Sequence, residues 1–163
     1  MRYVVMAILM TLTCLDLRMA QAADPFQREG LRGLPGVEVN IEKIASDAQA
    51  DGLSQEAIRT AVELILRSSG VRVLTTSETS PVLYVRVSTH KHSSALYAYA
   101  VTVWLLLNVS SVQRPEQPMI VVTWEADSGA VGTIGKDKLR QIIDIVQDQV
   151  REFTNDFLAV NPR

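Results

Sequence analysis

A long apolar strand in the middle of the chain constrains the fold more than any other feature. Residues 96–107 have the alternating pattern of a strand, and both of its faces are apolar. One face carries Tyr97, Tyr99, Val101, Val103 and Leu105, and the other carries Leu96, Ala98, Ala100, Thr102, Trp104 and Leu106. The chain must therefore either cover both faces of the sheet around this strand or leave an apolar face open.

Two segments have the periodicity of amphipathic helices. The first begins after Ser54, a good N-cap, and ends before Gly70, which can close a helix in the left-handed conformation. The second covers residues 136–158. Their apolar stripes are Ile58, Ala61, Val62, Ile65 and Leu66 in the first, and Leu139, Ile142, Ile143, Val146, Val150, Phe153 and Phe157 in the second. Each helix has one apolar stripe, so each can cover only one side of a sheet.

Strand patterns occur at five places, which are residues 37–42, 71–75, 82–88, 96–107 and 119–125. The first two flank the first helix closely and predict a right-handed βαβ unit with parallel strands. The last three predict an antiparallel meander. Two prolines in residues 113–118 are expected to interrupt its ladder, and the glycine-containing segment 127–135 is expected to be a loop.

These elements predict an α+β fold, a two-layer sandwich in the order βαββββα. The sheet is expected to be mixed and four- or five-stranded, with both helices on one face. A chain of 163 residues fits one domain. We divide it into a cleaved signal peptide (1–23), a lead-in segment rich in Gly, Pro and charge (24–36), and a single α+β domain (37–163).

The first residues have the composition of an export signal. Arg2 precedes a mostly apolar run over residues 4–15, and Ala20 and Ala22 form a small-x-small cleavage pattern. The run is too short for a stable membrane anchor. Thr13 replaces the small residue that precedes a lipidated cysteine, which argues against a lipoprotein anchored at Cys14. We expect a periplasmic protein.

Composition excludes several classes of function. The net charge is −2, so there is no electrostatic reason to expect nucleic acid or an anionic membrane as a partner. The single cysteine lies in the predicted signal peptide, so the mature chain can form no disulfide, thiolate metal site or cysteine nucleophile. We expect no cofactor.

The two histidines, His90 and His92, are weak candidates for metal ligands. They lie two residues apart at a predicted turn, and no carboxylate lies within several residues. Because a stable site needs three or four ligands, a solvated turn is the favoured interpretation.

No catalytic residues are predicted. Glu125 and Asp127 are the best carboxylate pair, but they fit a strand end followed by a solvated turn better than an active site. Glycines 129, 132 and 135 precede a helix without the spacing of a phosphate-binding loop, which favours a connector.

Asn155 and Asp156 lie near the carboxyl end of the last predicted helix. Because the helix dipole does not favour an acid at that end, we look for a structural role for this pair. We expect Asn155 to bond the backbone of a neighbouring segment and so fix the docking of the terminus.

Four segments carry a resemblance to known proteins. They are Leu-Tyr-Ala-Tyr-Ala at 96–100, Thr-Trp-Glu at 123–125, Val-Gly-Thr-Ile-Gly at 131–135 and Asn-Asp-Phe-Leu-Ala-Val-Asn-Pro at 155–162. Together they resemble a family of exported bacterial proteins of unknown function that end in an Asn-Asp-(aromatic)-Leu-Ala-Val-Asn-Pro tail. The order of elements is also similar to that of small α+β modules in envelope-assembly proteins. The resemblance implies a periplasmic location and supplies no catalytic residues.

The open apolar face is the feature that points to a function. Contiguous apolar patches on soluble proteins usually mark interaction sites. We expect a non-enzymatic binding or assembly module that uses this sheet face or a strand edge to bind an envelope protein or a second copy of itself. The residues expected to carry binding are Ala98, Ala100, Trp104 and Leu106. The alternatives are a carrier of a lipid or small apolar ligand and a hydrolase that uses Glu125 and Asp127.

Overall fold

The computed structural model describes residues 24–75, 80–127 and 129–162. Its elements are α2 (Pro25–Glu29), β1 (Glu38–Ile41), α3 (Ser46–Ala50), α4 (Gln55–Ser69), β2 (Val82–Lys91), β3 (Leu96–Ser111), β4 (Arg114–Glu125), β5 (Ala130–Gly135), the 3-10 helix η1 (Lys136–Gln141) and α5 (Ile142–Val160). The predicted signal peptide lies outside the described residues, and so does Cys14.

The strands form one mixed sheet of five strands in the order β1-β2-β3-β4, with β5 also paired to β3. β1 and β2 are parallel, while β2, β3 and β4 form the predicted antiparallel meander. β4 and β5 pair with successive parts of the same edge of β3, which makes them two halves of one interrupted edge strand. The predicted α+β class is confirmed.

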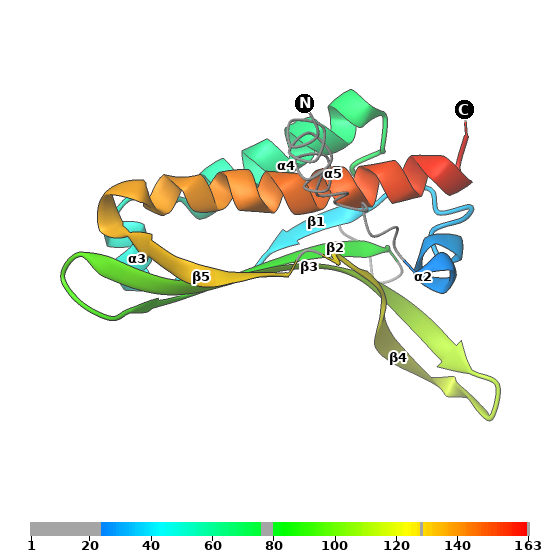
Figure 1. The fold of residues 1–163 in the computed structure, drawn as a ribbon. Coiled ribbons are helices and arrows are strands. Elements are labelled where there is room, and N and C mark those ends of the chain that lie inside the picture. Colours follow the sequence, from blue (N-terminus) through cyan, green and yellow to red (C-terminus); the bar gives the residue numbers. More distant parts are fainter. Residues whose placement is uncertain (1–23, 76–79, 128, 163) are drawn as a thin grey trace, which may run out of the picture.

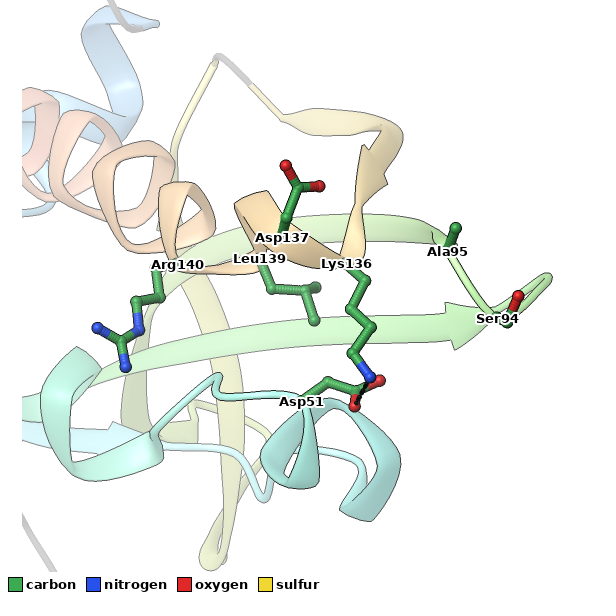
Figure 2. Close-up of a pocket in the computed structure, with 7 residues that line it drawn as sticks. All are labelled: Asp51, Ser94, Ala95, Lys136, Asp137, Leu139 and Arg140. Carbon is green, nitrogen blue, oxygen red and sulfur yellow. Dashed lines mark ion pairs between the residues drawn. The ribbon is translucent and has the colours of Figure 1, made fainter.

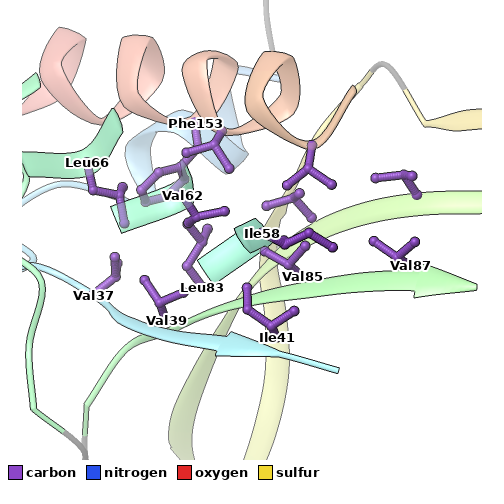
Figure 3. Packing of buried hydrophobic residues seen from close by; sticks show 14 of the residues in the cluster. Val37, Val39, Ile41, Ile58, Val62, Leu66, Leu83, Val85, Val87 and Phe153 are labelled. Carbon is purple, nitrogen blue, oxygen red and sulfur yellow. The ribbon is translucent and has the colours of Figure 1, made fainter. Parts of the chain in front are cut away.

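Both long helices lie on one side of this sheet (Figure 1). Ser54 caps α4 by accepting a hydrogen bond from the Ala57 amide, and Gly70 ends the helix in the left-handed conformation, as predicted. The stripes of α4 and α5 pack against side chains from one face of β1, β2 and β3, and this layer is the core (Figure 3). The core residues of β3 are Tyr97, Val101, Val103 and Leu105, all at most 1% exposed.

β3 is longer than the helices that cover it. Figure 1 shows its end and most of β4 extending away from the helix layer as a projecting hairpin, which we call the arm (residues 107–122). The arm bends from the sheet at a β-bulge, where Leu105 pairs with Trp124 but Leu106 pairs with Val122. Thr123 is the extra residue, and such an insertion bends and twists a strand.

Two local predictions are corrected by the structure, and a third holds in part. Residues 71–75 make only a single parallel bridge, from Val73 to Val37, so the parallel neighbour of β1 in the sheet is β2. Residues 130–135 are strand β5, whereas a loop was expected. The ladder is interrupted only at residues 115–117, which have no partner on β3, and β4 continues through Pro118 because an edge strand tolerates a residue with no amide hydrogen. The lead-in contains the short helix α2, capped by Asp24.

The outer edge of β1 is closed by side chains of α4. Arg59 donates a hydrogen bond to the Val39 carbonyl at 2.8 Å, and Gln55 donates one to the Ile41 carbonyl at 2.9 Å. Covering unpaired backbone groups in this way protects an edge from pairing with other strands.

A buried carboxylate joins α5 to β4 and α2. Asp156 is 6% exposed and accepts a hydrogen bond from the indole nitrogen of Trp124 at 3.0 Å and an ion pair from Arg28 at 3.0 Å. Trp124 is fully buried and contacts the edge of the Phe153 ring, with ring centroids 5.1 Å apart. This joint fixes the amino-terminal helix and the end of β4 to the last helix.

The terminus is held by a residue other than the expected one. Asn155 is exposed, whereas the side-chain amide of Asn161 donates hydrogen bonds to the Leu31 and Phe157 carbonyls and its oxygen accepts one from the Gly33 amide. The docking role predicted for Asn155 therefore belongs to Asp156 and Asn161.

Replacing Asp156 with alanine should lower the free energy of unfolding by about 1–3 kcal/mol, because it leaves the buried indole N–H of Trp124 without an acceptor. Urea unfolding followed by tryptophan fluorescence measures this loss. The control is Asp148→Ala on the exposed side of the same helix, which removes the surface ion pair to Arg151 and should cost less than about 1 kcal/mol. Equal losses in the two variants would contradict the joint.

Candidate functional site on the uncovered sheet face

The sheet face opposite the helices is the candidate site. No described segment packs over this face, which we call the far face (Figure 1). The predicted residues Ala98, Ala100, Trp104 and Leu106 all lie on it, as the alternation of β3 requires, and all four are partly exposed. The structure therefore presents an open sheet face with apolar residues on it.

The apolar residues of the far face gather at the end where the arm begins. The register places Val82 beside Leu106 and Tyr84 beside Trp104. The rings of Tyr84 and Trp104 stack with centroids 6.1 Å apart and an interplanar angle of 8°. Together with two exposed side chains of β4, these residues form what we call the far-face patch: Val82, Tyr84, Trp104, Leu106, Ile120 and Val122.

The patch holds some of the most exposed large apolar side chains of the described chain. Ile120 is 72% exposed and Val122 is 51% exposed. Burying one large apolar side chain contributes about 1.5–3 kcal/mol, so covering both would stabilise a complex substantially. The sequence predicts that either Val121 or Ile120 adjoins this face, because residues 119–125 have little polarity on either side. The register places Ile120 and Val122 there.

Ala98 and Ala100 lie at the opposite end of the far face. They pair with Thr133 and Val131 of β5 on one side and with His90 and Ser88 of β2 on the other. Polar groups separate this end from the far-face patch, since Arg86 pairs with Thr102 in the sheet and forms an ion pair with Glu42 at 3.2 Å. The four predicted residues therefore do not form one continuous site.

A small cavity opens beside the far-face patch. It has a volume of about 210 Å³ and is lined by Asn40, Ser80, Val82, Tyr84, Leu106, Leu107, Asn108 and Ile120. The Tyr84 hydroxyl beside it donates a hydrogen bond to Glu42 at 2.9 Å, and this bond to the carboxylate raises the pKa of Tyr84. Ligand pockets usually measure about 300–1,000 Å³, so the cavity suits one inserted side chain better than a whole ligand.

A larger cavity lies at the other end of the molecule, between η1, the turn after α3 and the β2–β3 turn (Figure 2). Its volume is about 400 Å³, and its lining residues are Asp51, Ser94, Ala95, Lys136, Asp137, Leu139 and Arg140. Figure 2 shows the ammonium of Lys136 directed at the Asp51 carboxylate, at 2.7 Å.

Asp51 is the centre of a charged cluster. Its carboxylate also accepts a hydrogen bond from the Tyr97 hydroxyl at 2.6 Å and an ion pair from Lys91 at 2.7 Å. Hydrogen bonds from Lys136, then Lys91 and Tyr97, hold the pKa of Asp51 well below its usual range. The Asp51 carboxylate raises the pKa of Lys91.

These shifts suit a structural joint better than proton transfer. A general acid or base works best with a pKa near the working pH, and the shifts of Asp51 and Lys91 move both groups away from neutrality. The cluster instead ties the turn after α3 to the end of β2 and the start of η1.

His90 and His92 do not gain further ligands from the fold. Both are exposed at the end of β2 and in the turn that follows it. In the described part of the chain, no group of three or more His, Cys, Asp or Glu side chains could hold a metal ion.

Glu125 and Asp127 lie on open surface at the end of β4. Their backbone amides donate hydrogen bonds to the side chains of Gln27 and Glu152 at 3.0 and 2.7 Å, which connects this strand end to α2 and α5. Gly132 lies under the Tyr99 ring, where a Cβ would approach the hydroxyl to 3.0 Å. The glycine therefore permits close packing within the sheet.

The comparisons with known proteins add little to this geometry. No model of a protein family matches the chain, and no curated protein matches it either. Solved structures with some similarity include a minor lipoprotein from Acinetobacter baumannii, at 11% identity over 76% of this chain and 94% of that chain, with a TM-score of 0.30. Another is the rare lipoprotein B from Shewanella oneidensis, at 15% identity over 76% of this chain and 91% of that chain, with a TM-score of 0.29. Both are bacterial lipoproteins, and scores this low carry no conclusion about function.

No helix among the described residues is long and apolar enough to cross a membrane.

Replacing Asp51 with asparagine should destabilise the fold in a pH-dependent way. The folded pKa of Asp51 is lowered, so its contribution is present above its unfolded pKa of about 4 and is lost as the pH falls below that value. The pKa of Lys91 is raised, so its contribution is present below about pH 10 and is lost as the pH rises further. The difference in Tm between wild type and D51N should be largest at pH 5–9 and should narrow at both extremes.

The matched control is Asp137→Asn. Asp137 lines the same cavity, but in Figure 2 it points away from Asp51, and it has no ion pair among the described residues. At neutral pH its Tm difference should be smaller than that of D51N, because the substitution removes no ion pair of the described residues. A D51N difference that stays constant from pH 3 to pH 11 would contradict the role of the cluster.

Proposed function

We propose that this protein is a non-enzymatic binding or assembly module of the bacterial cell envelope, which docks a protein partner on the far-face patch. The observation that carries the proposal is the open apolar end of the sheet, where Trp104 and Leu106 adjoin the exposed Ile120 and Val122. Stacking of Tyr84 on Trp104 holds a large aromatic surface in one orientation, which lowers the entropy that binding must remove.

The arrangement resembles the anatomy of a protein interface. Such interfaces have an aromatic and aliphatic centre surrounded by a polar rim. Here the ion pair between Arg86 and Glu42 lies next to the patch on one side, and Asn40 and Asn108 line the adjoining cavity. One apolar side chain of the partner would fill that cavity.

The carrier of a lipid or small apolar ligand is the alternative. It would use the space between the sheet and the helices, and in this structure that space is packed with the side chains of the core (Figure 3). The two cavities described above both open on the surface and lie outside this layer. We therefore favour the protein partner.

Photo-crosslinking tests the docking site. A photo-reactive phenylalanine derivative at Ile120 should give a defined crosslink to a different protein in cells, and Trp104→Glu in the same chain should abolish that crosslink by placing a charge at the centre of the patch. Because Trp104 is partly exposed, circular dichroism of the W104E variant should remain unchanged.

The control position is Leu64, an apolar residue that is 65% exposed on α4, on the helix side of the molecule. It should give no crosslink. Crosslinks of equal yield at Ile120 and Leu64, or a crosslink from Ile120 to a different protein that survives W104E, would overturn the proposed site.

The proposed location depends on residues 1–23, which lie outside the described part of the chain. We expect signal peptidase to cut after Ala22 or Ala23, since these alanines end the small-x-small pattern. Intact mass spectrometry of the exported protein should give the mass of a chain that starts at Ala23 or Asp24. The alternative outcome is the mass of a chain that starts at a lipid-modified Cys14, which the sequence around this cysteine does not favour. That mass would contradict the predicted cleavage.

A further inference from the structure

We propose that a second copy of the chain adds to the sheet by antiparallel pairing of the two β4 edges about Ile120. The inference goes beyond the proposed function, because edge pairing would join two far-face patches and leave both of them open to a further partner. It follows from three features of β4: its open edge, the direction of its backbone groups and the limits of its regular part.

The outer edge of β4 carries no strand among the described residues, because β4 ends the order of the sheet and β5 pairs with β3 instead. The edge of β1 is covered by Arg59 and Gln55, as described above. β4 has no such cover along residues 118–122, where four successive apolar residues, Met119 to Val122, follow Pro118. An open apolar edge is a template for strand addition.

The prolines show which backbone groups of β4 face outward. Pro118 pairs with Ser110 but has no amide hydrogen, so its nitrogen must face the open edge. Because strand residues alternate, the N–H and C=O groups of Ile120 and Val122 face the same way. Inward and outward amides also alternate at the other end of β4, beyond the bulge at Thr123. There the Ala126 amide donates to the Val103 carbonyl of β3, while the Glu125 amide faces outward and donates to Gln27.

The open edge is limited to residues 118–122 by an irregular stretch of β4 at one end and by helix α2 at the other. Next to the hairpin turn, Ser110 pairs with Pro118 and Ser111 with Arg114, so residues 115–117 have no partner on β3 and the strand is irregular there. At the other end, α2 lies against the strand, with Gln27 bonded to Glu125 and Gly30 close to the Thr123 carbonyl. The midpoint of the regular open segment is Ile120.

Pairing about Ile120 is self-complementary. The Ile120 amide of each copy would donate to the Ile120 carbonyl of the other, and the Val122 amide would donate to the Pro118 carbonyl. A two-fold axis perpendicular to the sheet keeps both far faces on the same side, so the two far-face patches would join. Ile120 would then meet Ile120, and Val122 would meet Pro118.

The surroundings of the edge also favour a second copy. Phe26 of α2 is 87% exposed and Val112 at the tip of the arm is 97% exposed. In the proposed pairing, the tip of each arm approaches α2 of the other copy, because α2 borders the segment that faces residues 114–117. The contact would cover apolar groups that are open in the single chain.

Analytical ultracentrifugation of the exported, processed protein over a range of concentrations tests the proposal. Wild type should show a monomer–dimer equilibrium. Ile120→Pro should give a monomer, because it removes the outward amide while leaving the ladder to β3 intact, as Pro118 already does. Ile120→Ala retains the amide and should keep a measurable dimer.

The outcomes separate this inference from the proposed function. A monomer at every concentration, or a dimer unaffected by I120P, would overturn pairing of two β4 edges. A crosslink from Ile120 to a different protein, together with monomeric sedimentation, would overturn the dimer and leave the docking function standing. Loss of both the crosslink and the dimer would overturn both.

Discussion

The fold depends on a mismatch between the sheet and the helices that cover it. α4 and α5 supply one layer, and they bury the face of β3 that carries Tyr97, Val101 and Leu105. A single helix layer cannot reach the opposite face, and it does not follow β3 to its end (Figure 1). The open far face and the projecting arm therefore both result from a single layer of helices that is shorter than β3.

The sequence predicted the architecture well where periodicity is strong. Both long helices, the meander and the one-sided cover follow from spacing, and the N-cap at Ser54 and the glycine at 70 mark the ends of α4. The expected number of strands agrees with the structure because two errors cancel: residues 71–75 form only a bridge to Val37, and β5, where a loop was expected, supplies the fifth strand. Strand β5 was not predicted because it contains Gly132 and Gly135, which are uncommon inside strands. It is held by pairing with β3 and by the close contact of Gly132 with Tyr99, and neither interaction is visible in the local sequence.

The alternation of side chains along β3 also predicted part of the candidate site. Alternation placed Trp104 and Leu106 on the open face, but it could not show that Ala98 and Ala100 lie apart from them. The bulge at Thr123 could not be anticipated either. It reverses the alternation of β4, so that Trp124 faces the core while Ile120 and Val122 face outward with Leu106.

The segments on which the resemblance to exported bacterial proteins rests serve as joints of the fold. Trp124 of the Thr-Trp-Glu segment bonds Asp156 of the carboxyl-terminal tail, and Asn161 of that tail holds the chain near Leu31. Tyr97 bonds Asp51, and Tyr99 packs on Gly132. Residues that maintain an architecture thus account for much of the pattern, while the open patch lies largely outside it.

The arm stands apart from the packed layers, with most of residues 107–122 exposed. Its length and side chains can therefore diverge between relatives at little cost to folding, because the core beneath α4 and α5 does not include them. A scaffold built in this way can keep one stable body while its protruding ribbon adapts to new binding partners.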